Sequence, residues 1–502
     1  MAYLVFDIGS SSVKAALVSE EGRLLAEARR PVALRQGDGP NEREAEPAEW
    51  IAAAASASRE IAARETASPV PVGEGSKGGL RGRAGGAEIR AIAVSGNGPT
   101  LLAVGADGLP LGPALSWMDR RATVEAAEVS RLAGLPLDSS FYLPKALWLW
   151  KNRAEVREKA RWFFSCPEYL EYRLSGEAVT YLPDSGYEPY IWSKRLIGLL
   201  GLPEGLFPPF AAPGGVVGRL LPGPAAEFGL PAGIPVVAGF PDFLACIVGS
   251  GSTAPGLACD RSGTSEAINL CAAKPYPGRA LLSLPHAVKG LWNLSGGLST
   301  AGKALEWTAR VAGFSGLGED SLFAEAQRSP PGARGLVFLP YLAGERAPLW
   351  SPERRAAFVG LSLAHGREDL ARAACEALAF GLRYPLELAR EAGFEARTVR
   401  ASGAPARNDF LAQLKADVLG LPVETPEIAD CELSGDAAAC ALALGEASSL
   451  AEAADRLVRI ERRFEPDRRF RGRYDAAYDH YREALAALGP VDERAAARRG
   501  ED

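Results

Sequence analysis

The sequence lacks the features that mark several classes of protein. Its three histidines lie far apart, and none of its seven cysteines forms a CxxC pair. This pattern argues against a zinc site and against a disulfide framework. The formal net charge is −6, so we expect no nucleic-acid partner. No hydrophobic run approaches the ~20 residues that cross a bilayer, so we expect no membrane partner.

The N-terminus also lacks the pattern of a signal peptide. No basic region precedes the first hydrophobic run, and Asp7 lies inside that run. We therefore interpret this segment as a core strand. Together with the scattered cysteines, it places the protein in a reducing cytoplasm.

The length and order of the predicted elements indicate a two-domain α/β protein. The chain has 502 residues, more than one hydrophobic core usually supports. Strands and helices alternate twice along it, which predicts two mixed β-sheets flanked by helices. A Gly- and Pro-rich insertion is expected over residues 66–86 and an interdomain hinge over 249–256. Residues 490–502 are expected to form a tail.

The most informative stretch runs from Asp7 to Lys14. A hydrophobic run ends at the carboxylate, and Gly9, three serines and a lysine follow before the next hydrophobic run. This pattern predicts a β-hairpin whose turn offers backbone N–H groups and hydroxyls to phosphate oxygens. Asp7 could hold a metal ion through water. An ordinary surface hairpin is the alternative.

A second turn of this kind lies about 250 residues further on. Gly263 and Thr264 stand among small and hydroxyl residues between two short strand-like runs. Some 20 residues earlier, Asp242 follows the hydrophobic strand 234–239. Phosphoryl transfer to a hydroxyl needs a phosphate cradle, a divalent cation and a base, and Asp242 is the candidate base. An isolated Asp after a strand is more often a cap or turn residue.

Several segments in order carry a family resemblance. They are Lys145–Asn152, Phe338–Pro348 followed by Ala356–Leu361, and Ser402–Gln413. Together with Asp7, Asp242 and Gly263, they resemble the FGGY carbohydrate kinases, which belong to the fold group of actin, hexokinase and the Hsp70 ATPase domain. The resemblance implies a two-domain, ribonuclease H-like (actin-like ATPase) fold with the active site in the interdomain cleft. Residues 1–248 would bind the sugar and residues 249–489 the nucleotide.

The resemblance also assigns roles to individual residues. Asp242 would be the catalytic base, and with Asp7 it would lie at the Mg²⁺. The residues expected to bind ATP are Gly9, Ser10, Ser11, Ser12, Lys14, Gly263, Thr264, Gly302, Gly403, Ala404 and Asn408. Those expected at the sugar are Asn97, Trp117, Asp119, Arg120, Asp242 and Phe243. For Asp119, a strand end followed by a helix cap is the alternative.

The implied activity is ATP-dependent phosphorylation of a terminal hydroxyl of a small sugar, with a ketopentose such as xylulose as the first choice. Gluconate or a polyol is the alternative acceptor. Some residues depart from the family pattern: Ala404 and Pro405 replace two glycines, and Phe243 stands where Asn or Gln is usual. They motivate a second alternative, a catalytically decayed sugar- or nucleotide-binding regulator. The resemblance leaves a homodimer open.

Overall fold

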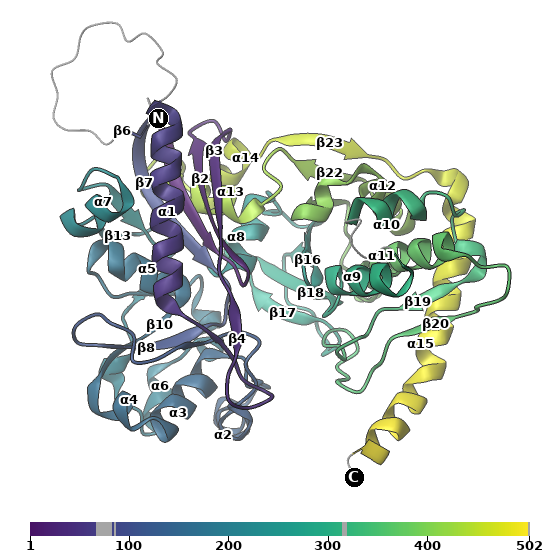
Figure 1. Ribbon diagram of the computed structural model, residues 1–502, viewed down its shortest axis with the longest axis horizontal. Helices are drawn as coiled ribbons and strands as arrows, with labels where there is room; N and C mark the ends of the chain where they lie inside the picture. The colour runs from purple at the N-terminus through teal and green to yellow at the C-terminus, as the bar shows by residue number, and fades with distance from the viewer. Residues whose placement is uncertain (67–82, 85–86, 314–318, 500–502) are drawn as a thin grey trace, which may run out of the picture. The chain divides into compact units, whose positions relative to one another are not determined.

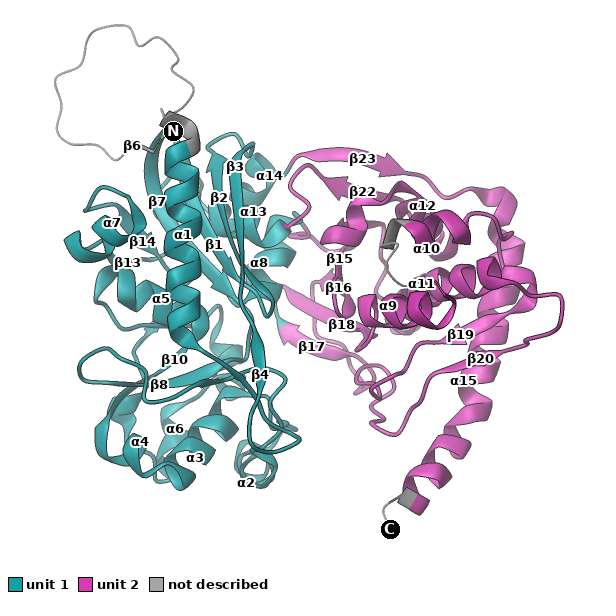
Figure 2. Cartoon of the chain, in the orientation of Figure 1, with its two compact units in different colours: residues 1–251, 285–289, 431–458 teal, residues 252–284, 290–430, 459–502 magenta. Residues whose placement is uncertain are grey.

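The computed structural model describes residues 1–66, 83–84, 87–313 and 319–499. The chain forms two compact units (Figure 2). Unit 1 comprises residues 1–251, 285–289 and 431–458, and unit 2 comprises 252–284, 290–430 and 459–502. The predicted insertion over 66–86 lies outside the described residues, except for Thr66, Arg83 and Ala84.

The main sheet of unit 1 has the strand order β13-β14-β7-β1-β2-β3, with β6 paired to β7. Strand β1 pairs antiparallel with β2 and parallel with β7, and β7 pairs parallel with β14. Every residue of β1 is buried, which explains its almost unbroken hydrophobic run. The strands are β1 (Ala2–Ile8), β2 (Ser12–Ser19), β3 (Leu24–Pro31), β6 (Arg83–Ala84), β7 (Ala87–Gly96), β13 (Val216–Arg219) and β14 (Pro235–Val237).

Two smaller sheets complete unit 1, with the orders β10-β8-β9-β5-β4 and β11-β12. Their strands are β4 (Leu34–Gln36), β5 (Arg43–Ala45), β8 (Leu101–Gly105), β9 (Ala114–Leu115), β10 (Ala160–Ser165), β11 (Thr180–Tyr181) and β12 (Phe210–Ala211).

The main sheet of unit 2 repeats the topology of the first. Its order is β17-β18-β16-β15-β21-β22-β23. Strands β18, β16 and β15 are antiparallel neighbours, and β21 and β22 follow in parallel. These five strands match β3, β2, β1, β7 and β14 of unit 1 one for one, which confirms the prediction of two mixed sheets. The strands are β15 (Leu257–Ser262), β16 (Glu266–Ala272), β17 (Leu282–Pro285), β18 (Trp292–Leu298), β21 (Thr398–Ser402), β22 (Val423–Pro426) and β23 (Ile460–Phe464), and β19 (Val337–Leu339) pairs with β20 (Ala357–Val359) elsewhere in the unit.

Helices flank both main sheets (Figure 1). Those of unit 1 are α1 (Pro47–Thr66), α2 (Thr123–Ala133), α3 (Tyr142–Asn152), α4 (Ala154–Lys159), α5 (Cys166–Ser175), η1 (Ser185–Tyr190), α6 (Lys194–Leu199), η2 (Glu204–Leu206), α7 (Pro222–Phe228), α8 (Asp242–Gly249), α13 (Cys431–Ala443) and α14 (Leu450–Leu457). Those of unit 2 are α9 (Gly302–Val311), α10 (Glu319–Ala326), η3 (Ala333–Gly335), α11 (Arg367–Glu391), η4 (Ala404–Arg407), α12 (Asp409–Leu419), η5 (Arg468–Phe470) and α15 (Arg471–Arg499).

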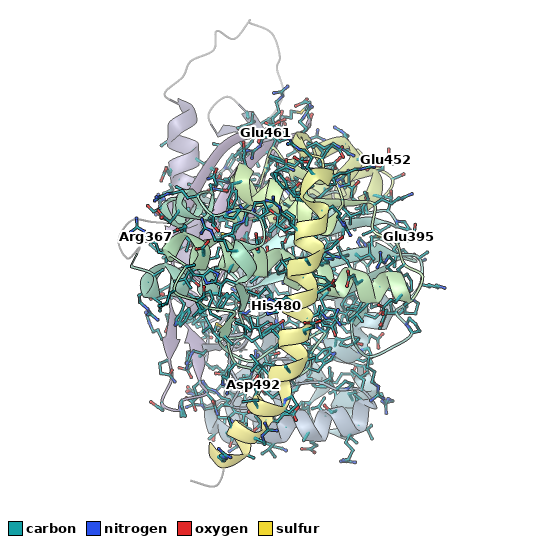
Figure 3. The ribbon with its side chains drawn as sticks, turned by 90° about the vertical axis from the view of Figure 1, so that its right-hand side faces the viewer. Arg367, Glu395, Glu452, Glu461, His480 and Asp492 are labelled. Carbon is teal, nitrogen blue, oxygen red and sulfur yellow. The ribbon has the colours of Figure 1, made fainter. Side chains whose placement is uncertain are left out.

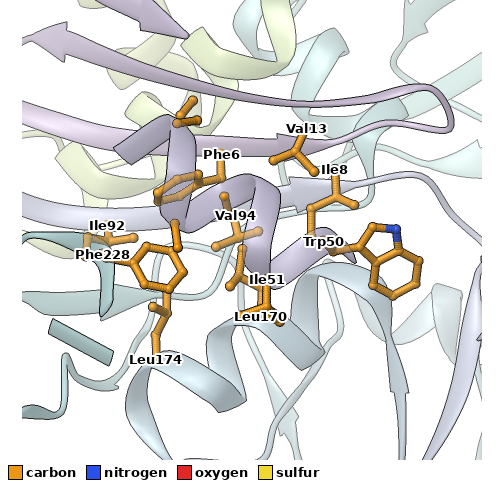
Figure 4. Close-up of a cluster of buried hydrophobic side chains, with 14 of the residues drawn as sticks. Phe6, Ile8, Val13, Trp50, Ile51, Ile92, Val94, Leu170, Leu174 and Phe228 are labelled. Atoms are coloured by element: carbon orange, nitrogen blue, oxygen red, sulfur yellow. The ribbon is translucent and has the colours of Figure 1, made fainter. Parts of the chain in front are cut away.

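The core of unit 1 lies between the main sheet and helices α1, α5 and α7 (Figure 4). Phe6 of β1 meets Phe228 of α7 edge to face, with ring centroids 6.0 Å apart. Edge-to-face pairs of this kind are favourable beyond the area they bury. Trp50 of α1 is 2% exposed and belongs to the same core. The first strand, which ends at the predicted phosphate turn, is therefore held rigidly along its length.

Helix α13 packs against α8 and against strands β1 and β7. It belongs to unit 1 although residues 252–284 and 290–430 of unit 2 precede it in sequence. The crossing with α8 is close because both helices carry glycine there. A Cβ at Gly435 would lie 2.0 Å from the carbonyl oxygen of Ala245, and one at Gly249 would lie 1.8 Å from that of Cys431. Only glycine permits this approach.

The described chain ends in α15, which runs through Pro490 to Arg499. Figure 3 shows His480 and Asp492 on this helix. Its second half contacts the loop that precedes β20, because Arg354 donates to the Leu485 carbonyl and the Arg355 backbone N–H donates to Asp492. The range expected to be a tail thus begins as helix.

Candidate functional site

The first predicted hairpin is the β1–β2 turn of unit 1. Asp7 and Lys14 face each other in its register, and the Lys14 ammonium lies 3.0 Å from Asp7 Oδ2. The Gly9 N–H donates to the Ser12 carbonyl over 2.9 Å and closes the turn. A Cβ at Gly9 would lie 3.0 Å from that carbonyl oxygen, so a side chain fits poorly there. Ser10 and Ser11 remain at least partly exposed at the tip.

Asp7 has the chemistry that a cation site requires. The residue is 3% exposed, and its Oδ1 atom is buried without a hydrogen-bond partner among the described residues. A buried carboxylate oxygen in this condition is costly unless an ion or water satisfies it. Mg²⁺ in nucleotide sites is held by one or two carboxylates together with waters and phosphates. Asp7 therefore fits a magnesium ligand, directly or through water.

Asp242 lies at the same edge of the same sheet. Strands β14, β7 and β1 are parallel, so their carboxyl ends meet there. A bridge between Gly96 and Pro241 extends the pairing of β14 with β7 up to the residue before Asp242. Asp242 is the first residue of α8, and its Oδ1 accepts the Phe243 N–H over 2.6 Å. In open α/β sheets, this edge is where ligands bind.

The electrostatics of Cys166 link the two aspartates. This thiol is fully buried at the start of α5, and its Sγ lies 3.3 Å from the Asn97 carbonyl oxygen. Burial raises the pKa of the thiol well above its ordinary value, and the charges of Asp242 and Asp7 raise it further. Both carboxylates therefore lie close enough to the Cys166 thiol to raise its pKa, which places them in one region at the sheet edge.

The residues predicted at the sugar divide into two groups. The Trp117 indole N–H donates to Ser10 Oγ over 2.9 Å, which places this partly exposed ring beside the first hairpin. Arg120 donates to the Trp117 carbonyl, and Phe243 is partly exposed next to Asp242. These three remain candidates for substrate contact.

Asn97 and Asp119 are engaged by the protein. The Asn97 amide donates to the Ile8 carbonyl over 2.8 Å, and its oxygen accepts from Thr100. Asp119 is fully buried, accepts the Arg43 N–H over 2.8 Å and pairs with the Arg121 guanidinium. Both side chains brace the loops that carry the candidate contacts.

Lys145, from the first family-like motif, ties those loops together. Its ammonium is fully buried and donates to the carbonyls of Pro99 and Ser116, each over 2.6 Å. Burial lowers the pKa of this ammonium well below its ordinary value. The lysine thus fixes the segment after Asn97 and the segment before Trp117 at once.

The second predicted hairpin is the β15–β16 turn of unit 2. The Gly263 N–H donates to the Ser265 carbonyl over 2.9 Å. The turn packs on the start of α9, where the Ala301 and Gly302 N–H groups donate to the carbonyls of Thr264 and Gly263, each over 3.0 Å. A Cβ at Gly302 would lie 2.6 Å from the Gly263 oxygen, so this contact needs glycine.

The predicted adenine-side turn also packs on this hairpin. Gly403 has φ +88°, and a Cβ there would lie 1.9 Å from the Ser262 carbonyl oxygen. Ala404 and Pro405 begin the short helix η4, and Asn408 caps α12 by accepting the Leu411 N–H over 3.0 Å. Close backbone approach occurs at Gly403, with Ala404 and Pro405 in the next turn. The predicted nucleotide residues of unit 2 therefore gather around one hairpin.

Sequence reasoning missed Lys415, which lies under that hairpin. Its ammonium is paired with Asp260 and Glu266. The sequence does contain a signal for this cluster. Each of the three charged residues lies on a strand or helix face whose other residues are largely hydrophobic. A charge in such a position needs a partner, but the sequence does not say which one.

The described residues contain neither a larger metal-binding cluster nor a membrane-spanning helix. In the ranges given above, no group of three or more His, Cys, Asp or Glu is placed to hold a metal ion. Within the same ranges, no helix has both the length and the hydrophobicity to cross a membrane.

Comparisons with known proteins cover nearly the whole chain. The family model described as "FGGY family of carbohydrate kinases, N-terminal domain" matches residues 2–249, and the model of the family's C-terminal domain matches residues 261–444. The xylulose kinase of Bacillus subtilis is 27% identical over 500 residues, covering 96% of each chain. The glycerol kinase of Thermus brockianus is 31% identical over 420 residues, covering 77% of this chain and 81% of the relative.

Among solved structures, the xylulose kinase from Rhodospirillum rubrum superimposes with a TM-score of 0.81. It is 26% identical, and the match covers 98% of this chain and 100% of that one.

Proposed function

Because the chain belongs to the FGGY family of carbohydrate kinases, phosphotransferases that use ATP, we propose that it phosphorylates a terminal hydroxyl of a ketopentose such as xylulose. The observation that carries the proposal is the pair of carboxylates at one sheet edge. Asp7 is the second-last residue of β1, beside the first hairpin, and Asp242 follows β14 as the first residue of α8. Phosphoryl transfer to an alcohol needs both a cation ligand and a base at the phosphate, and only β7 separates strand β1 from strand β14 in the sheet.

Asp242 is the base of the proposed reaction. Its carboxylate takes the proton of the acceptor hydroxyl as that oxygen attacks the γ-phosphorus of ATP. The bond between the γ-phosphorus and the β,γ-bridging oxygen breaks, and ADP leaves. The first residue of a helix suits this role, because the surrounding N–H groups orient the side chain, as the Phe243 N–H does here.

The first hairpin serves the phosphates. Gly9 keeps the backbone accessible, Ser10, Ser11 and Ser12 supply hydroxyls, and Lys14 supplies positive charge next to Asp7. Mg²⁺ held at Asp7 would neutralise charge on the phosphate oxygens. The orphaned Asp7 Oδ1 supports this assignment. The second hairpin, with Gly263, Thr264, Gly302, Gly403 and Ala404, serves the nucleotide in the same way.

The choice of xylulose rests on relatives that match nearly the full chain, such as the xylulose kinase of Bacillus subtilis. Trp117 and Phe243 supply apolar surface and Arg120 supplies donors for the sugar, while Asn97 and Asp119 hold the loops. The more identical glycerol kinase of Thermus brockianus favours a polyol as the second candidate.

The test of the base is Asp242→Asn, which keeps the shape of the side chain and removes its basicity. We expect kcat to fall by about 10²- to 10⁴-fold, with ATP affinity within about threefold of the parent. A coupled assay of ADP release and calorimetry with ATP measure the two quantities. Asp107→Asn, on an exposed turn of the same unit, is the matched control and should keep full activity.

The acceptor is tested with a panel of xylulose, ribulose, gluconate and glycerol. The proposal expects the highest kcat/KM with xylulose. Highest turnover of glycerol or gluconate would transfer the assignment to that acceptor. Measurable ATP binding without turnover of any compound would favour a regulator with a decayed site, and full activity of Asp242→Asn would remove Asp242 from the base role.

A further inference from the structure

Lys415 is buried directly beneath the second hairpin. It projects from α12 and is 2% exposed. Its ammonium donates to Asp260 Oδ2 over 2.6 Å, to Ser262 Oγ over 3.0 Å and to Glu266 Oε1. An ammonium has three donors, so this one hairpin satisfies all of them.

The three acceptors come from both strands of the hairpin. Asp260 and Ser262 lie two residues apart on β15 and share a face, and Ser262 pairs with Glu266 of β16 in the register. That pair closes the loop Gly263–Ser265. The Ser262 hydroxyl also lies within hydrogen-bond distance of both carboxylates. Lys415 therefore bonds to both strands at the base of the loop.

The same helix begins at the predicted adenine-side turn. Asn408 caps α12, and the backbone at Gly403 lies against the Ser262 carbonyl. The hairpin is thus joined to the α12 segment at two points, Gly403 and Lys415. A shift of the loop relative to the turn would have to break the ionic contacts.

The cluster carries one ammonium and two carboxylates. Burial raises the pKa of Asp260 above its ordinary value, while the charge of Lys415 opposes the rise and Glu266 adds to it. Glu266 Oε2 is buried without a hydrogen-bond partner among the described residues. Ionisation of Asp260 therefore adds one negative charge under the loop.

We propose that Lys415, together with Asp260 and Glu266, is a positioning cluster that sets the affinity for the nucleotide phosphates by fixing the second hairpin on α12. This inference rests on the proposed function, because it assumes that the hairpin binds ATP. The cluster does not touch the reacting atoms. It controls where the N–H groups of the loop stand and how much negative charge lies behind them.

The first experiment replaces Lys415 with methionine, which keeps the length of the side chain and removes its charge. In this variant the hairpin loses its ionic contact with α12, and Asp260 and Glu266 lose the ammonium that balances their charge. We expect KM for ATP to rise at least tenfold while KM for the sugar stays within about twofold, because the sugar residues lie in unit 1. A smaller folded fraction would lower the apparent kcat but not alter KM, so KM for ATP reports on the hairpin even if part of the variant misfolds.

The second experiment uses Asp260→Asn, which keeps the hydrogen-bonding shape and removes the titrating charge. Calorimetric binding of ATP is measured from pH 6.0 to pH 8.5. We expect the parent to lose about three- to tenfold in affinity relative to the variant as the pH rises, because the ionised cluster repels phosphate. Titration of the nucleotide itself is common to both proteins and cancels in the comparison.

Asp369→Asn is the matched control for both experiments. Asp369 is another fully buried carboxylate of unit 2. It lies in the first turn of α11 and pairs with Arg334 of η3. Its variant should leave ATP affinity and its pH profile as in the parent.

Two results would overturn the inference while leaving the kinase intact. One is an unchanged KM for ATP in Lys415→Met, and the other is parallel pH profiles in the parent and Asp260→Asn. If the protein is inactive with every sugar, the proposed function is refuted. The cluster can still be tested in that case, because calorimetric binding of ATP needs no acceptor.

Discussion

At the scale of single residues, this protein concentrates buried charge where its proposed chemistry lies. Asp7, Asp436 and Glu171 are all less than 4% exposed in unit 1. A carboxylate in such a place is expensive unless it has a partner or a function. Asp7 has a proposed function as a cation ligand. Asp436, on α13, has no role in the proposed reaction, so its charge should weaken the fold.

The pH dependence of stability tests this. Burial raises the pKa of Asp436 well above its ordinary value, the charges of Asp7 and Glu171 raise it further, and Ser95 partly offsets them. The folded protein therefore holds this proton more tightly than the unfolded chain. Its stabilising contribution is complete below the ordinary Asp pKa and is lost as the pH rises through the folded value.

We expect Asp436→Asn to be more stable than the parent at pH 8 by about 1–3 kcal/mol, the usual cost of a buried polar group left unsatisfied, and close to it at pH 4.5, where the parent carboxyl is protonated. Urea denaturation at the two pH values measures the difference. Asp455→Asn, at an exposed position of α14, is the control and should show no such difference. An equal effect of Asp436→Asn at both pH values would contradict the explanation.

At the scale of elements, the contacts that matter most are those where backbone meets backbone. The α8–α13 crossing depends on Gly249 and Gly435, and the second hairpin depends on Gly302 and Gly403. At each position, an added methyl group would overlap with a backbone carbonyl oxygen of a neighbouring segment. Backbone cannot move aside as a flexible side chain can, so these glycines are needed for packing.

Gly435→Ala should therefore be strongly destabilising. Its Cβ would lie 2.0 Å from the Ala245 carbonyl oxygen, and the two helices would have to separate. We expect a loss of about 3 kcal/mol, at the upper end for overpacking. Gly198→Ala in α6, whose Cβ would meet no atom within 4 Å, is the matched control. It should be neutral or stabilising by about 0.5–1 kcal/mol, and equal losses in the two variants would disprove the packing argument.

At the scale of the whole molecule, the chain completes unit 1 only after most of unit 2 has been synthesised. Helix α13 covers β1 and β7 and packs along α8. Without it, those strands and that helix would expose hydrophobic surface to water. Unit 1 is therefore not a contiguous piece of sequence.

We accordingly expect residues 1–251 alone to be insoluble or partly folded. The same segment joined by a flexible linker to residues 431–458 should be soluble and should unfold cooperatively. Circular dichroism and size-exclusion chromatography distinguish the two. Cooperative unfolding of residues 1–251 by themselves would show that α13 is dispensable.

Much of this architecture could be predicted because local signals report it. The Asp7–Lys14 hairpin, its counterpart at Gly263 and the strand before Asp242 each have a pattern of hydrophobic, glycine and hydroxyl residues that fixes the local backbone. The order of the motifs identified the family, and the two mixed sheets followed from the alternation of strands and helices. These properties depend on neighbours in sequence, so the sequence by itself determined them.

The rest depended on which distant residues meet, and only the tertiary structure decided it. Asp119 was a candidate sugar ligand, yet the fold buries it where it accepts the N–H of Arg43, 76 residues away in sequence. Lys415 had no local motif, yet it lies under a hairpin about 150 residues away. A charged side chain has the same identity whether it binds substrate or an ion partner, and its role follows from what packs against it.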